Sequence, residues 1–323
     1  MKDLHGVQGR ERAGRQDALA VRIIGALEVR RGGEMLGMKE LGGPKCRQIL
    51  EILLLQLGRP VSKARLVELL WGERPPAAAV STLESYVSVL RRSLQPGMGA
   101  AGPLKTTTGG YFLDRAGVDL DLDRFDAFLR TAEQAEPARA HALLREALQL
   151  ATAPLLGNEF LQGWAESERS FHEARVAGAR LRAAETALTL GDTDDAGRWA
   201  KAVLASEPLN EAAWTVLVLS LERAGHPVEG LRAYEDCRRV LDTELGCAPG
   251  PSLREAQQRL LGATADGAGE FGEVLAALLT IQERIGNGAA DTASGPDRNP
   301  AWDGCEEASG IVRRYLRRAM AAA

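Results

Sequence analysis

The sequence predicts a mainly α-helical protein with a small α+β part toward its N-terminal end. Between residues 44 and 113, apolar spacing predicts three helices followed by a short β-hairpin. From residue 119 onward, alanine, leucine, arginine and glutamate dominate, and apolar residues recur at helical spacing in one segment after another. A length of 323 residues is enough for two domains, each with its own core.

Strands are expected before the first helix. Residues 1–20 are polar, lack the apolar segment of a secretory signal, and are predicted to form a disordered leader. Residues 21–36 alternate apolar and polar side chains around Gly32-Gly33, which predicts a hairpin with a glycine turn. A short third strand is expected near residues 38–41, and Pro44 then opens the first helix.

The second and third helices have clear local signals. Ser62 is a good N-cap for the second helix, and Pro75-Pro76 breaks the chain before the third. At 100° per residue, one face of the third helix is apolar; it carries Val80, Leu83, Val87, Leu90 and Leu94. The opposite face is polar and carries Ser81, Ser85, Ser88 and Arg92. Three helices followed by a hairpin are the plan of a winged helix, whose third helix and wing enter DNA grooves.

The side chains around the third helix suit contact with DNA. Small hydroxyls bond base edges, a valine touches a thymine methyl, and cations, threonines and backbone N–H groups bind phosphates. We expect the DNA contacts to come from Lys45, Arg47, Lys63, Arg65, Ser81, Thr82, Ser85, Ser88, Val89, Arg91, Arg92, Lys105, Thr106, Thr107, Thr108, Gly110 and Tyr111. The alternative is an ordinary amphipathic surface helix flanked by solvated side chains.

Charge is unevenly distributed along the chain. The formal net charge is −4, yet residues 21–115 hold 14 Lys and Arg against 8 Asp and Glu. Residues 116–323 hold 22 against 33. A basic block beside an acidic block fits a nucleic-acid-binding domain joined to a protein-contact domain. The alternative is chance clustering of surface charge.

The second half predicts a series of helices. Helical spacing covers residues 122–135, 138–151, 163–190, 194–206, 211–224, 227–245 and 252–261. The later pairs resemble tetratricopeptide repeats, which must stack because one unit cannot bury its apolar face alone. The expected domains are a leader (1–20), a winged-helix domain (21–115), a helical domain (119–262) and a C-terminal extension (263–323). The extension is either a frayed tail or a partner contact.

Catalysis, metal binding and membrane insertion are not expected. The four cysteines and four histidines have no metal spacing, and no nucleophile elbow or Gly-rich phosphate loop is present, so we expect no cofactor and no enzyme. No apolar run is long enough to span a bilayer, and a cytoplasmic protein is expected.

The run of motifs in order resembles the Streptomyces antibiotic regulatory protein (SARP) family over residues 20–262. The segments that carry the resemblance to its OmpR-like winged helix-turn-helix are Gly43-Pro44-Lys45-Cys46-Arg47, Leu69-Leu70-Trp71-Gly72, Tyr86-Val87-Ser88, Leu90-Arg91-Arg92 and Gly110-Tyr111. Those that resemble its all-α, tetratricopeptide-like bacterial transcriptional activation domain are Asp121-Leu122-Asp123-Arg124-Phe125, Glu207-Pro208-Leu209-Asn210-Glu211 and 244–251.

The resemblance implies a transcriptional activator of antibiotic biosynthetic genes. Such proteins bind direct repeats near the −35 region of a promoter as two protomers, and they recruit RNA polymerase through the sigma factor and the alpha subunit. This chain departs from the family at Val89 and Thr107, where basic residues are usual. These two losses keep a second reading open, in which the helical repeats form a protein-interaction scaffold beside a weakened DNA-binding domain.

Overall fold

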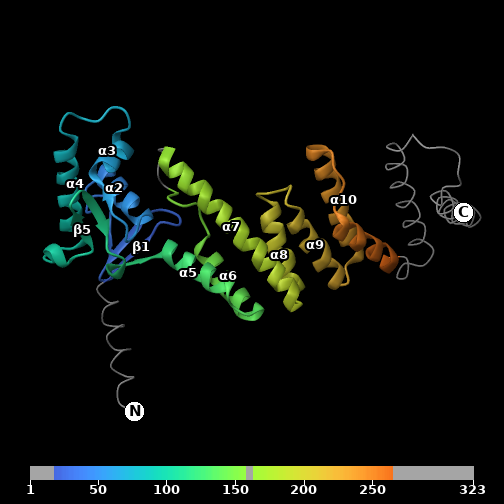
Figure 1. Cartoon of the computed structure of the whole chain (residues 1–323). Coiled ribbons are helices and arrows are strands. Elements are labelled where there is room, and N and C mark those ends of the chain that lie inside the picture. The colour runs from blue at the N-terminus through green and yellow to red at the C-terminus, as the bar shows by residue number, and fades with distance from the viewer. Residues whose placement is uncertain (1–17, 158–162, 265–323) are drawn as a thin grey trace, which may run out of the picture. The chain divides into compact units, whose positions relative to one another are not determined.

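The computed structural model describes residues 18–157 and 163–264. Residues 1–17 of the predicted leader (1–20) and most of the predicted C-terminal extension (263–323) lie outside these residues. The leader prediction is wrong at its end, because Leu19 and Ala20 belong to the first strand. The chain forms two compact units, divided between Ala179 and Arg180. Figure 1 shows strands and helices in the first unit and helices in the second, which confirms the predicted fold class. In the described part, no helix is long and apolar enough to cross a membrane.

The N-terminal unit begins with a four-stranded sheet in the order β3-β2-β1-β7. Its strands are β1 (Leu19–Arg22), β2 (Glu28–Arg31), β3 (Glu34–Leu36) and β7 (Val118–Leu120). The predicted glycine turn is confirmed between β2 and β3, where Gly32 and Gly33 have φ of 56° and 89°. The strand predicted at residues 38–41 is wrong, because these residues form a turn that leads into the first helix.

The winged helix follows in the predicted order. It comprises α2 (Pro44–Leu55), β4 (Val61–Ser62), α3 (Lys63–Trp71), α4 (Ala79–Leu94), β5 (Leu104–Thr107) and β6 (Gly110–Leu113). The Ser62 side chain accepts a hydrogen bond from the Arg65 N–H at 3.1 Å, which confirms the predicted cap. Leu83, Val87 and Leu90 of α4 are buried as predicted, whereas Val80 is 49% exposed and lies outside the core.

Asp121 joins the first sheet to the helices that follow. Its carboxylate is 2% exposed and accepts hydrogen bonds from the Ile23, Ile24 and Leu122 N–H groups at 2.8–3.1 Å. Burial raises the pKa of Asp121, and these backbone hydrogen bonds oppose the rise. The carboxylate satisfies amide groups at the end of β1 that would otherwise be unpaired in the core.

The helices after Asp121 complete the N-terminal unit. They are α5 (Asp121–Glu133), α6 (Pro137–Leu150) and the first part of α7 (Gly163–Leu190). Leu143, Leu144 and Ala147 of α6 are buried, and α5 and α6 pack closely against each other. Buried apolar residues recur at helical spacing in α5 and α6, so the sequence pattern was enough to predict both helices.

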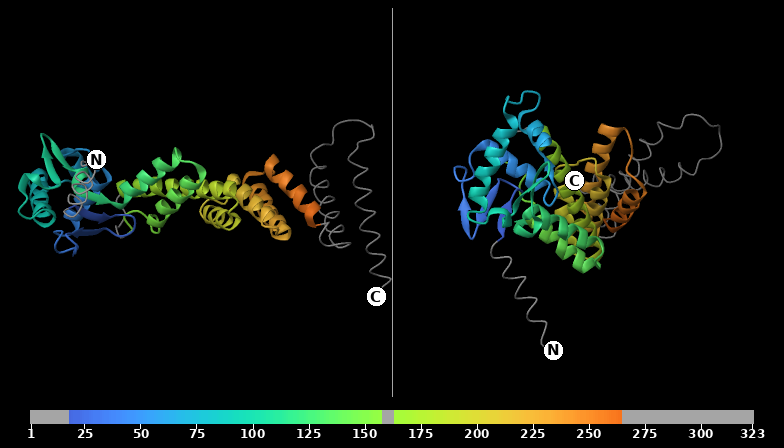
Figure 2. Two further views of the ribbon diagram at one scale, coloured as in Figure 1. Left: turned by 90° about the horizontal axis from the view of Figure 1, so that it is seen from below. Right: turned by 60° about the vertical axis from the view of Figure 1, so that its left-hand side comes forward.

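The second unit is built from helices that stack in chain order (Figures 1 and 2). After the end of α7 come α8 (Thr193–Leu204), α9 (Glu211–Arg223), α10 (Pro227–Leu245) and a helix over residues 251–264. One apolar core unites them, with Ala196, Val218 and Tyr234 among its buried members. The predicted stacking of helical hairpins is therefore present.

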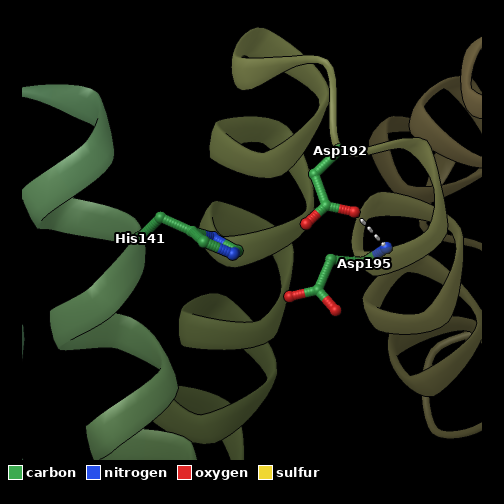
Figure 3. Close-up of side chains that lie close together, drawn as sticks. All are labelled: His141, Asp192 and Asp195. Carbon is green, nitrogen blue, oxygen red and sulfur yellow. Dashed lines mark hydrogen bonds between the residues drawn. The ribbon is translucent and has the colours of Figure 1, made fainter.

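Capping residues set where the helices of the second unit begin and end. Asp192 accepts a hydrogen bond from the Asp195 N–H at 3.0 Å and caps α8, as Figure 3 shows. Asn210 caps α9 in the same way through the Ala213 N–H. Gly246 ends α10 in the left-handed conformation, at φ 65°.

Candidate nucleic-acid interface

The outer face of α4 presents a row of small polar side chains. Ser81, Ser85, Ser88 and Arg92 are exposed, and the buried leucines on the opposite side anchor the helix against α2 and α3. A helix with such an exposed face can approach the floor of a major groove, because short side chains leave room for its backbone. The structure therefore brings together the four residues that the helical wheel placed on this side.

The serine hydroxyls on this face bond their own helix. Ser81, Ser85 and Ser88 donate to the carbonyl oxygens of Ala78, Ser81 and Glu84 at 3.0, 3.0 and 2.9 Å. With their protons engaged, these hydroxyls present acceptor lone pairs to the exterior. In this arrangement the serines favour base edges that donate a hydrogen bond.

Arg92 is the exposed cation of α4. Among the described residues, its guanidinium has no ion-pair or hydrogen-bond partner. It lines a cleft of about 640 Å³ together with Arg91, Lys105 and Thr106, between the end of α4 and β5. An unpaired guanidinium at this position can bind a phosphate or a guanine edge.

The wing is held against α4 by Arg91. Its Nε donates to the Leu104 carbonyl at 3.2 Å and its Nη2 to Thr106 Oγ1 at 2.5 Å. The guanidinium also lies 5.9 Å from the centroid of the Tyr111 ring. Arg91 therefore positions the wing beside α4, and its positive charge stays near the surface.

Some of the remaining wing residues are exposed at the surface, and others are buried and support the hairpin. Thr106 and Thr108 are exposed, Thr107 is half-buried, and Lys105 bonds Asp114 at 2.6 Å. Lys105 is the main cause of the lowered pKa of Asp114. Gly110 and Tyr111 are buried, so they support the wing. A Cβ at Gly110 would collide with the Val61 carbonyl of β4, which explains the glycine there.

The N-terminal end of α3 adds two cations, each with an acidic neighbour. Lys63 Nζ lies 2.6 Å from Glu84 Oε1, and Arg65 Nη1 lies 2.8 Å from Glu68 Oε2. The Arg65–Glu68 pair is solvent-exposed, so a phosphate can compete for the Arg65 guanidinium, whereas Lys63 is partly buried. The hydrogen bond to Glu84 raises the pKa of Lys63 and keeps it charged.

Four predicted DNA contacts are partly or fully buried, or are held by other groups of the protein. Arg47 is 9% exposed and bonds the fully buried Glu51 at 3.0 Å, a burial that does not fit a direct DNA contact. Lys45 donates to the Leu70 carbonyl at 2.6 Å, and burial lowers its pKa. Val89 is half-buried against Gly42, and Thr82, about two turns earlier on α4, is also half-buried.

Two exposed residues of α4 were missed by the sequence reasoning. Val80, which was predicted on the apolar face, is 49% exposed. Glu84 lies between Ser81 and Ser88, one turn from each, and faces outward. The helical wheel contains the signal for Glu84, because residues 81, 84, 85 and 88 share one arc.

A winged helix with this outward-facing third helix defines a DNA-binding regulator, and comparisons with known proteins give the family. The family of the transcriptional regulatory protein C-terminal domain matches residues 40–113, and that of the bacterial transcriptional activator domain matches residues 120–261. Regulatory protein DnrI of Streptomyces peucetius is 32% identical over 231 residues, which cover 67% of this chain and 84% of DnrI. Regulatory protein AfsR of Streptomyces coelicolor is 37% identical over 256 residues, which cover 76% of this chain.

The solved structure of Mycobacterium tuberculosis EmbR in complex with a low affinity phosphopeptide has the same fold. Its TM-score is 0.64 at 26% identity, covering 82% of this chain and 71% of EmbR. The match to AfsR covers about a quarter (24%) of that protein's length. The chain belongs to the SARP family of transcriptional activators.

Proposed function

We propose that this protein activates a secondary-metabolite gene cluster by binding promoter DNA through α4 and the wing. The observation that carries this proposal is the outer face of α4, where Ser81, Ser85, Ser88 and Arg92 lie together and exposed. Residues 21–115 form the DNA-binding domain in this proposal, and residues 119–262 form the activation domain. Its relatives DnrI and AfsR are regulatory proteins of Streptomyces, which supports the same role.

The target in this proposal is a direct repeat near the −35 region, occupied by two protomers. One winged helix covers only a few base pairs of major groove, so two copies spaced by one helical turn read a longer site. The bound pair recruits RNA polymerase through its sigma factor and alpha subunit. The charge of the chain supports this division, because the basic winged helix suits DNA and the acidic helical half suits a protein partner.

Replacing Arg92 by alanine tests the DNA face directly. We expect binding to the target duplex to weaken by more than about 1 kcal/mol, because the unpaired guanidinium is lost from the end of the reading helix. Fluorescence anisotropy with a labelled duplex measures the change. Arg30→Ala is the matched control, since it removes an exposed cation of β2 and should leave the affinity nearly unchanged. An equal loss in both variants would mean that only total charge matters.

A further inference from the structure

The outer face of α4 carries a carboxylate, Glu84, on the side toward Lys63 of α3, and this face would approach a polyanion. The Glu84 side chain is 48% exposed, and along the sequence of α4 it lies between Ser81 and Ser85. A carboxylate near phosphates weakens binding unless a cation neutralises it or a hydrogen-bond donor on the DNA meets it. We therefore expect the Glu84 carboxylate to have a specific role when the protein binds DNA.

Lys63 supplies the neutralising charge and holds Glu84 in place. Its Nζ donates to Glu84 Oε1 at 2.6 Å, and it also lies 5.8 Å from the centroid of the Tyr111 ring. The Lys63 backbone N–H bonds the Gly109 carbonyl at 2.9 Å, so the wing turn fixes the start of α3. Glu84 of α4, the Tyr111 ring and the wing turn at Gly109 thus restrain Lys63, and the Lys63 ammonium group in turn orients the Glu84 carboxylate.

The second carboxylate oxygen is available to a base. Of the two carboxylate oxygens of Glu84, Oε1 has a hydrogen-bond partner among the described residues and Oε2 has none. An ionised carboxylate only accepts hydrogen bonds, so it is incompatible with guanine O6 and N7 and with thymine O4. Cytosine N4 is a donor in the major groove, and adenine N6 is a donor beside the N7 acceptor.

We propose that Glu84 determines sequence specificity by accepting a hydrogen bond from an exocyclic base amine, cytosine N4 above all, while Lys63 positions it. This inference rests on the proposed function. The neighbouring hydroxyls support it, because Ser81, Ser85 and Ser88 also present lone pairs outward. The centre of the face is thus rich in acceptors, and Arg92 provides the donor at its C-terminal end.

Selection from a randomised duplex library with the full chain tests this role. The wild-type chain should enrich cytosine at one position of the half-site. Glu84→Gln should shift that position toward adenine, because an amide pairs with adenine N6 and N7 together. Glu84→Ala should lose the preference there by at least about fivefold and leave the other positions unchanged. Glu68→Gln, which breaks the similar exposed pair with Arg65 on α3, should retain the wild-type preference.

The outcomes separate this inference from the function on which it rests. If the Glu84 variants select the same bases as the wild-type chain at every position, Glu84 only restrains Lys63 and the inference is overturned. If Glu68→Gln alters the same position, the effect comes from surface charge and the inference also fails. If the wild-type chain enriches no sequence at all, the proposed function itself fails.

Discussion

Asp121→Ala is expected to destabilise the N-terminal unit more than any other single substitution considered for this protein. The change removes the acceptor for the Ile23, Ile24 and Leu122 N–H groups, two of which lie at the buried end of β1. Each buried donor left unpaired costs about 1–3 kcal/mol, so the free energy of unfolding should fall by at least about 3 kcal/mol.

Urea denaturation followed by circular dichroism measures this loss. Asp121→Asn should be intermediate, because the amide keeps one acceptor oxygen but turns an NH₂ donor toward the backbone donors. The control is Asp119→Ala, which removes an exposed carboxylate two residues away that lies 3.5 Å from Arg124. Equal stability of the Asp119 and Asp121 variants would show that the buried carboxylate does not hold the sheet to α5.

The second large effect is a loss of stability in mild acid that originates at His172. The ring is 2% exposed on α7, and it meets the Phe125 ring edge-on with centroids 5.0 Å apart. Neither ring nitrogen has a hydrogen-bond partner among the described residues. Burial, with a smaller contribution from Arg175, lowers the pKa of His172 to about 4, and Asp126 opposes this shift.

The direction of the pH effect follows from this lowered pKa. Well above pH 6.5 the ring is neutral in both the folded and the unfolded chain, and its full contribution to stability is present. As the pH falls from 6.5 toward 4, the unfolded chain takes up the proton first. The free energy of unfolding should then decrease by about 2 kcal/mol at pH 5 and about 3 kcal/mol at pH 4.

Urea denaturation at pH 7 and pH 5 checks this expectation. His172→Phe keeps an aromatic ring against Phe125 and should be less sensitive to acid than the wild-type chain by about 2 kcal/mol. His226→Gln replaces an exposed histidine and serves as the control, with the acid sensitivity of the wild-type chain. The assignment to His172 fails if the His172 variant loses as much stability at pH 5 as the control.

Local signals made much of the fold predictable. Ser62 caps α3 through a hydrogen bond to a residue three positions ahead, and Gly32-Gly33 adopts the conformation that a tight hairpin requires. Such features depend on neighbours in sequence, so residue types and spacing reveal them. The same holds for the buried leucine spacing of α4.

Long-range partners were not predictable from the sequence. The parallel pairing of β7 with β1 joins residues almost a hundred positions apart, and β7 has only three residues. Arg47 and Glu51 resemble an ordinary exposed pair at i and i+4, yet tertiary packing buries both. The Lys63–Glu84 pair spans two helices, so the helical wheel of α4 alone gives no sign of it.

The central claim is that the α4 face and the wing read promoter DNA. It is tested most directly by a salt titration of the full chain with the promoter of the neighbouring biosynthetic genes, against a scrambled duplex of equal length. We predict tight, selective binding whose logarithmic affinity falls linearly with the logarithm of salt concentration, because Lys and Arg displace counterions from phosphates. Equal and weak binding to both duplexes would contradict the claim and favour the protein-interaction scaffold.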